Sequence, residues 1–229
     1  RLGPGLAGPV LVFALASPEM QFYAAETRPY ALCLLLMALS VVFLVRLHES
    51  FTWTSAIAWA VTAGLGMQFH PTSVFALTGQ AVWVVATGRA RAVRWLAPLL
   101  LAPAVALPEF LSLISIRTYP SELSFAAPPT LVSVLGLLFP RSILGPAAVA
   151  LAATLLLAGK PDGKLPARRW LALAAALAFG PVLAATAISS LTPFQFLLTR
   201  YVISAWLGWF LLLACLLAAW RSPRARLLF

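Results

Sequence analysis

Residues 170–199 read WLALAAALAFGPVLAATAISSLTPFQFLLT, a run of thirty residues that contains no Asp, Glu, Lys or Arg. A helix that crosses a bilayer needs about 20 mostly apolar residues, so this run is long enough to span a membrane. Arg200 alone separates it from a second uncharged run, 201–220. This part of the chain therefore predicts that the protein lies in a membrane.

The composition of the whole chain agrees with a membrane environment. Of its 229 residues, 62% are hydrophobic and 10% are charged, and the formal net charge is +10. Soluble domains carry about 45–50% apolar and about 25% charged residues, and disordered chains need low hydrophobicity. The composition thus excludes most soluble classes. The two cysteines, Cys33 and Cys215, lie in apolar runs and are expected to be buried and unpaired.

Other runs without charged residues predict further membrane helices. The run 50–88 is long enough for two crossings, and the turn at His70-Pro71 divides it, because proline begins a helix more readily than it continues one. Pro128, Pro129 and Pro140 leave room in 123–140 only for an interfacial or re-entrant helix. We expect an all-α polytopic membrane helix bundle that forms a single transmembrane domain over 1–229. Its transmembrane helices, about eight in number, are expected at 2–17, 30–47, 53–69, 71–87, 93–114, 142–158, 170–188 and 201–220.

The basic residues divide unequally between the two sides of such a bundle. With the N-terminus inside, twelve of the sixteen fall on one side, and the other four are Arg28, Arg117, Arg141 and Arg200. Because positively charged loops stay in the cytoplasm, the side with twelve is predicted to be cytoplasmic. The excess of positive charge is therefore interpreted as a topology signal, and no nucleic-acid partner is expected. The sequence shows no spacing of metal ligands.

The outer side carries unusual polar residues in the loop 18–30. Glu26 and Tyr30 are four residues apart, as are Glu19 and Tyr23, so a helix would place each pair on one face. Charged groups at membrane depth are costly and are usually functional when they face the bundle interior. The alternative left open is that these side chains extend to the lipid headgroups within an aromatic belt.

Three more outer residues are candidates for a site. His70 lies in a tight turn. Its side chain either forms a hydrogen bond within the turn or contacts a ligand or a phosphate. Glu109 follows Pro108 near the end of a predicted crossing. A side chain that extends to the lipid headgroups would explain a charged residue at this position. Arg200 interrupts a stretch, 170–220, that is otherwise uncharged, and topology requires no outer arginine there. An outward-facing cavity lined by arginines would suit a lipid phosphate, because guanidinium pairs with phosphate oxygens and stays charged.

Three motifs along the chain form a recognisable pattern. Residues 23–32 match the string Tyr-x-x-Glu-x-Arg-x-Tyr-x-Leu, residues 68–70 form a turn that ends in His, and Arg200-Tyr201 opens a late helix. In this order the motifs resemble polytopic glycosyltransferases of the GT-C superfamily. The most similar branch is the bacterial one that includes relatives of protein O-mannosyltransferases, aminoarabinose transferases and Rgt-type lipid-sugar transferases. The resemblance extends over nearly the whole chain.

This resemblance implies an enzyme that moves a sugar from a polyprenyl-phosphate carrier to a lipid, glycan or protein acceptor, usually with inversion. The reaction would take place on the extracytoplasmic face of a membrane, here the cytoplasmic membrane of a bacterium. A carboxylate base activates the acceptor hydroxyl, and cationic groups or a divalent metal offset the charge of the leaving phosphate. The family's base is an Asp in an earlier outer loop, whereas the only Asp here is Asp162, on the cytoplasmic side. We therefore expect a longer GT-C module with further helices upstream, and an isolated chain that is inactive.

The resemblance also implies roles for six residues in substrate binding, while the catalytic base has no candidate in the chain. Arg28 and Arg200 would hold the carrier phosphate. Glu26 would orient Arg28 or help to hold a metal or the acceptor. The cavity would be lined by Tyr30, His70 and Tyr201.

Two competing hypotheses remain open at this point. A non-enzymatic transporter or lipid-carrier flippase would place its polar groups near the midplane, between two related halves. An inert assembly subunit would scatter them along the headgroup level. The enzyme hypothesis instead requires Glu26, Arg28, His70 and Arg200 to surround one outer cavity.

Overall fold

The computed structural model describes residues 11, 14–15, 17–25, 30–87, 92–116, 128–158, 168–192, 196 and 199–217. Every regular element in these ranges is helical, and none of them contains a strand. The prediction of an all-α fold is thereby confirmed. The first predicted crossing, 2–17, lies almost entirely outside the described residues.

The helices begin and end close to the boundaries expected from the uncharged runs. In chain order they are α2 (Pro18–Ala25), α3 (Tyr30–Glu49), α4 (Trp53–Phe69), η2 (Pro71–Ser73), α5 (Val74–Ala86), α6 (Ala92–Ile116), α7 (Leu131–Leu138), α8 (Arg141–Ala158), α9 (Arg168–Leu191), α10 (Thr199–Val202) and α11 (Ala205–Leu217). The helix predicted over 53–69 has those limits. The helix predicted over 201–220 is divided into α10 and α11 by a turn at Ile203 and Ser204.

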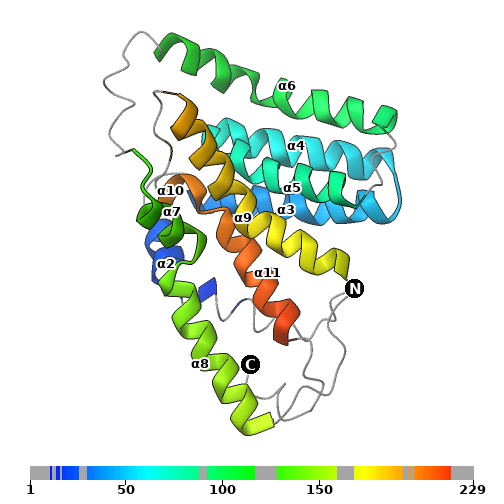
Figure 1. The fold of residues 1–229 in the computed structure, drawn as a ribbon. Helices are drawn as coiled ribbons and strands as arrows, with labels where there is room; N and C mark the ends of the chain where they lie inside the picture. Colours follow the sequence, from blue (N-terminus) through cyan, green and yellow to red (C-terminus); the bar gives the residue numbers. More distant parts are fainter. Residues whose placement is uncertain are drawn as a thin grey trace.

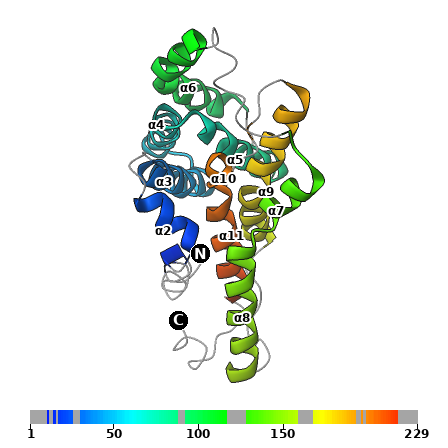
Figure 2. The same ribbon diagram turned by 90° about the vertical axis from the view of Figure 1, so that its left-hand side faces the viewer.

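The helices form a bundle in which most of the extensive helix contacts join helices that are not consecutive along the chain. Figure 1 shows α4 between α3 and α6, with α5 against α9 and α9 against α11. The contact face of α4 is rich in alanine, and Ala56, Ala60 and Ala63 are each 0% exposed. Figure 2 shows α8 extending beyond the other helices. Small side chains on α4 let the helices on either side approach closely, as in membrane bundles generally.

Helices α5 and α9 approach each other closely at a pair of glycines. A Cβ added to Gly180 would lie 2.7 Å from the Cα of Gly79, and one added to Gly79 would collide with the carbonyl oxygen of Ala176. No side chain larger than hydrogen fits between these two backbones. Glycine at these two positions lets the backbones of α5 and α9 come close together, although glycine inside a helix costs about 1 kcal/mol relative to alanine.

Two helices in the described part of the chain are long and apolar enough to cross a bilayer, α3 and α9. The pair Leu131–Leu138 and Arg141–Ala148, bent by 45°, is a third span if it counts as one broken crossing. The expected number of about eight is therefore not reached. Other apolar helical segments, Pro71–Ala86, Pro98–Ser112 and Ala205–Leu216, have 10–17 residues each, and the turns at His70-Pro71 and Ile203-Ser204 limit the first and the last of them.

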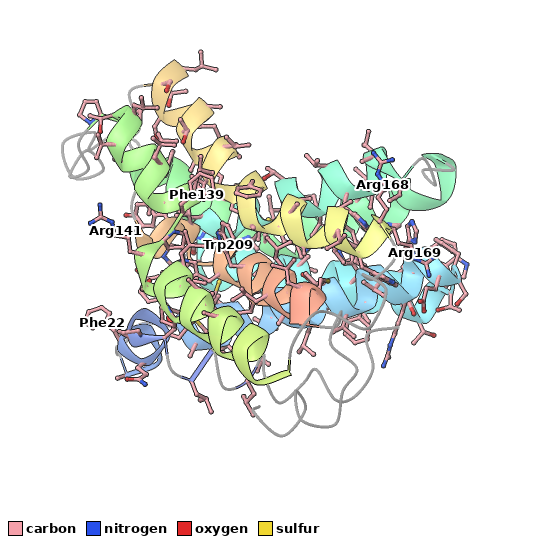
Figure 3. All side chains as sticks on the ribbon, turned by 60° about the horizontal axis from the view of Figure 1, so that its bottom comes forward. Phe22, Phe139, Arg141, Arg168, Arg169 and Trp209 are labelled. Atoms are coloured by element: carbon pink, nitrogen blue, oxygen red, sulfur yellow. The ribbon has the colours of Figure 1, made fainter. Side chains whose placement is uncertain are left out.

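The bend between α7 and α8 follows from Pro140 and is held by aromatic packing. The short helix expected in 123–140 is present as α7, which begins after Pro128 and Pro129. Phe139 packs at 6.0 Å from Phe179 of α9 and at 6.1 Å from Trp209 of α11, measured between ring centroids. Figure 3 shows Phe139 above Trp209 in the bundle. These contacts fix the start of α8 against the bundle.

Candidate functional site

The turn at His70 is built by backbone geometry that the sequence dictates. His70 ends α4 in an extended conformation, with φ −154° and ψ 110°, and its N–H donates to the carbonyl of Gly66. Pro71 then begins η2, where its missing N–H costs nothing. The Nδ1 atom of His70 lies 2.6 Å from the hydroxyl of Thr72, so a side chain of the next turn fixes the orientation of the imidazole.

His70 lies between two tyrosines that come from distant parts of the chain. Its ring centroid is 5.0 Å from that of Tyr30, the first residue of α3, and 5.7 Å from that of Tyr201 in α10. Tyr30 is 2% exposed, whereas His70 and Tyr201 are partly exposed. We call these three residues the Tyr30–His70–Tyr201 cluster. Three of the six predicted site residues therefore meet at one end of the bundle.

Of the other three predicted site residues, Glu26, Arg28 and Arg200, the structure describes only the backbone of Arg200. Glu26 and Arg28 lie outside the described residues, immediately before Tyr30. Arg200 belongs to α10, next to Tyr201, and its backbone alone is described. Among the described residues, no group of three or more His, Cys, Asp or Glu side chains could hold a metal ion.

Two polar side chains that sequence analysis did not assign to the site support the cluster from below. The thiol of Cys33 lies 2.8 Å from the hydroxyl of Ser73, and this contact joins α3 to η2. Cys33 follows Tyr30 by three residues, and Ser73 follows His70 by three. Helical spacing places Tyr30 and Cys33 on one face of α3, whereas His70 is extended and helical spacing does not relate it to Ser73. Both thiols, Cys33 and Cys215, are free and buried, which confirms that they form no disulfide with each other.

Phe196 also belongs to this end of the molecule, although the sequence offered no signal for it. Its ring lies 6.3 Å from that of Tyr201 and 5.6 Å from that of Phe75 in α5. Its backbone N–H donates to the hydroxyl of Ser189 at 2.7 Å, so Phe196 is held against α9. These contacts position Tyr201 against His70.

Glu109 lies near the same end of the bundle, at the junction of α6 with α4. It is partly buried, and its backbone N–H donates to the side-chain carbonyl of Gln68 at 3.4 Å. Gln68 precedes His70 by two residues. Through this hydrogen bond Glu109 lies close in space to the His70 turn, although it is far from it along the chain.

A second group of polar side chains lies in the middle of the bundle, and its members form hydrogen bonds with one another. The indole N–H of Trp59 donates to the side-chain carbonyl of Gln80 at 2.8 Å, and the Gln80 amide donates to Ser40 at 2.8 Å. The Ser40 hydroxyl donates to the carbonyl of Met37. Gln80 and Ser40 are 1% and 0% exposed. These groups satisfy one another, so they hold α3, α4 and α5 together rather than offering an open site.

The two ends of the bundle differ in charge. Figure 3 shows Arg168 and Arg169, at the start of α9, at the end opposite to Arg141 and Phe22. The Tyr30–His70–Tyr201 cluster lies at the end of Arg141, because α3 begins and α4 ends there. This separation matches the assignment of Arg168 and Arg169 to one side of the bundle and of Arg141 to the other.

Comparison of the chain with protein families, with curated proteins and with solved structures finds no match.

Proposed function

We propose that this protein is the membrane part of a glycosyltransferase that uses a polyprenyl-phosphate sugar. The observation that carries the proposal is the meeting of Tyr30, His70 and Tyr201, which lie far apart in sequence. These residues come from the three motifs that together resemble the GT-C superfamily. An inert subunit would have no reason to gather them. Their contact supports a common site at the end of the bundle where α3 begins.

The phosphate of the carrier would bind beside this cluster. Arg28 is two residues from Tyr30, so their Cα atoms are at most about 7 Å apart, and Arg200 is adjacent to Tyr201. Both arginines are therefore held near the cluster by the chain itself. A guanidinium group donates paired hydrogen bonds to phosphate oxygens and keeps its charge at any physiological pH. The surrounding apolar helices suit the polyprenyl chain.

The cluster would orient the sugar and the acceptor, while the base would come from elsewhere. Tyrosine and histidine present both aromatic faces and hydrogen-bonding atoms, which sugars use together in binding sites. In this proposal a carboxylate base activates the acceptor hydroxyl, with Glu26 near Arg28.

In the proposed arrangement the protein is a polytopic protein of a bacterial cytoplasmic membrane, and the cluster faces outwards. Helices α4, α5, α6 and α11 pack along the two candidate spans and their neighbours, so they would lie at the same depth and complete the polytopic bundle. The unequal division of basic residues supports the orientation.

Binding of the carrier tests the proposal on the chain as it stands. The 229-residue protein in nanodiscs is titrated with a polyprenyl phosphate and with the polyprenol of equal length. We expect tighter binding of the phosphate, and at least tenfold weaker binding after Arg28→Ala or Arg200→Ala, since a charged hydrogen bond is worth about 1.5–3 kcal/mol. Arg141→Ala, an exposed arginine at the same end, is the control. Equal affinity for alcohol and phosphate would refute the proposal.

Sugar transfer, measured in membranes in which the wild-type protein is active, tests the catalytic part. Arg28→Ala should greatly reduce transfer while the protein remains folded. Tyr201→Phe keeps the ring that contacts His70 and should retain more activity than Tyr201→Leu. Wild-type transfer by the Arg28 variant would show that the phosphate is held elsewhere.

The transporter hypothesis has one observation in its favour, the polar group at Ser40, Gln80 and Trp59 near the middle of the helices. Its members bond to one another, whereas a transport site must leave polar atoms for its cargo. We therefore favour the enzyme. Counterflow of a labelled lipid carrier without sugar transfer would reverse that preference.

A further inference from the structure

The end of the bundle opposite to the Tyr30–His70–Tyr201 cluster carries a second organised group. Both candidate spans meet it, because α3 ends at Glu49 and α9 begins at Arg168. Exposed side chains here include Arg168, Arg169 and Trp53, the last 59% exposed. Figure 3 shows Arg168 and Arg169 together at this end. We call it the arginine–tryptophan end.

A stack of rings runs through this end and finishes on a guanidinium group. The ring of His48 in α3 lies 4.4 Å from that of Trp83 in α5. Trp83 lies 6.5 Å from Trp170 in α9, with the planes 19° apart. The guanidinium carbon of Arg169 is 4.9 Å from the centre of the Trp170 ring. The stack therefore joins three helices and places one arginine at its outer end.

The base of this stack is rigid. Trp83 is 0% exposed, and its indole N–H donates to the backbone carbonyl of Arg169 at 2.8 Å. The same tryptophan thus fixes the backbone of Arg169 and supports the ring on which its side chain lies. The guanidinium loses little further conformational entropy when it binds a ligand.

Stacking also determines which part of the guanidinium is left for a ligand. Contact with Trp170 uses the flat face of the group, whereas its N–H donors lie in the plane and point outwards. A phosphate can accept two such hydrogen bonds at once. Exposed Arg168 lies beside it, and Arg46 is in the last turn of α3 at this end. The last turn of α3 also contains an acidic residue, Glu49.

We propose that the arginine–tryptophan end binds the phosphate of an anionic phospholipid, and that Arg169 stacked on Trp170 makes the main contact. Because both candidate spans meet this end, its side chains lie at the depth of lipid headgroups. Tryptophan and basic residues are favoured at that depth, and each basic residue near an anionic surface contributes about 1 kcal/mol. The proposal does not depend on the transferase activity.

Lipid binding by the whole 229-residue protein tests this proposal. The protein is placed in nanodiscs of phosphatidylcholine, with and without phosphatidylglycerol, and retained lipid is counted by native mass spectrometry. We expect preferential retention of phosphatidylglycerol and a higher Tm in its presence. Arg169→Gln should weaken retention about fivefold, the factor that corresponds to about 1 kcal/mol. Trp170→Leu should do the same while Arg169 remains.

Arg141→Gln is the matched control, because it removes the same charge from an exposed arginine at the opposite end. It should leave phosphatidylglycerol retention at the wild-type value. If Arg169→Gln folds with an unchanged Tm in phosphatidylcholine and still retains phosphatidylglycerol as wild type does, the proposal is wrong. It is equally wrong if Arg141→Gln lowers retention as much as Arg169→Gln.

Discussion

Gln80 joins three helices through its single side-chain amide. It accepts a hydrogen bond from Trp59 of α4 and donates one to Ser40 of α3, while its own backbone belongs to α5. All three side chains are buried. In a membrane interior no water would replace these partners. The hydrogen bonds of the Gln80 amide therefore stabilise the packing of the three helices.

Replacing Gln80 by Leu should destabilise the protein by about 1–2 kcal/mol, because the indole N–H of Trp59 is left buried without an acceptor. The free energy of unfolding in SDS titrations of the micellar protein measures this loss. Gln21→Leu is the control, since Gln21 is exposed on α2. That change should stay within about 0.5 kcal/mol. Similar losses in both variants would mean that the hydrogen bonds of Gln80 do not stabilise the fold.

The Tyr30–His70–Tyr201 cluster shows which residue contacts the sequence could suggest. The motifs predicted that its members belong to one site, and the rings do meet. They did not predict the support from Phe196 and from the contact of Cys33 with Ser73, because those residues matter through packing. A pattern of residue types indicates which side chains can bind a substrate. It does not indicate which side chains support them, because many apolar residues can fill the same packing position.

Helices α5 and α9 pack with their backbones close together. The Cα of Gly79 faces Gly180 across a gap that no side chain can enter. By contrast, a Cβ on Gly136 of α7 would meet no atom within 4 Å. The two kinds of glycine cannot be distinguished in the sequence, because both occur within apolar helices.

Gly79→Ala should therefore destabilise the protein by about 1–3 kcal/mol or more, since the added methyl group collides with the backbone of α9. Gly136→Ala, the matched control, should be neutral or stabilising by up to about 1 kcal/mol, because alanine favours helix. SDS unfolding of both variants measures the difference. A stable Gly79 variant would show that α5 and α9 can separate without cost.

Breaks inside the uncharged runs were predictable where proline marks them and not elsewhere. Pro71 separates α4 from η2, and Pro140 separates α7 from α8, as the sequence indicated. The turn at Ile203-Ser204 has no such marker, so the predicted helix 201–220 was too long at its start. The count of about eight crossings was too high for a related reason. An uncharged run shows that a segment tolerates lipid, but it does not show that one helix continues through it.

On the scale of the whole molecule, the two ends have different chemistry. One end gathers tyrosines and histidine beside the segments of Arg28 and Arg200. The other end gathers arginines and tryptophans where the candidate spans meet water. The proposed orientation places the first end outside the cell and the second in the cytoplasm.

Labelling of single cysteines tests that orientation. Cys33 and Cys215 are 6% and 1% exposed, so the folded protein should react little with a membrane-impermeant maleimide. Ser50→Cys lies at the end of α3 and Pro128→Cys before α7, and both positions are exposed. In spheroplasts, Pro128→Cys should react directly, and Ser50→Cys only after permeabilisation. The reverse pattern would invert the proposed topology and remove the site from the outer face.

The sequence by itself determined the all-α class, the positions of most helices and the separation of basic residues between the two ends. These properties depend on local hydrophobicity, on proline and on charge, each of which acts within a few residues. The tertiary structure decided that Tyr30 and Tyr201 flank His70, that Gln80 connects three helices and that Gly79 lies against Gly180. Such contacts join residues tens to hundreds of positions apart, and they depend on how whole helix faces pack, which no local pattern specifies.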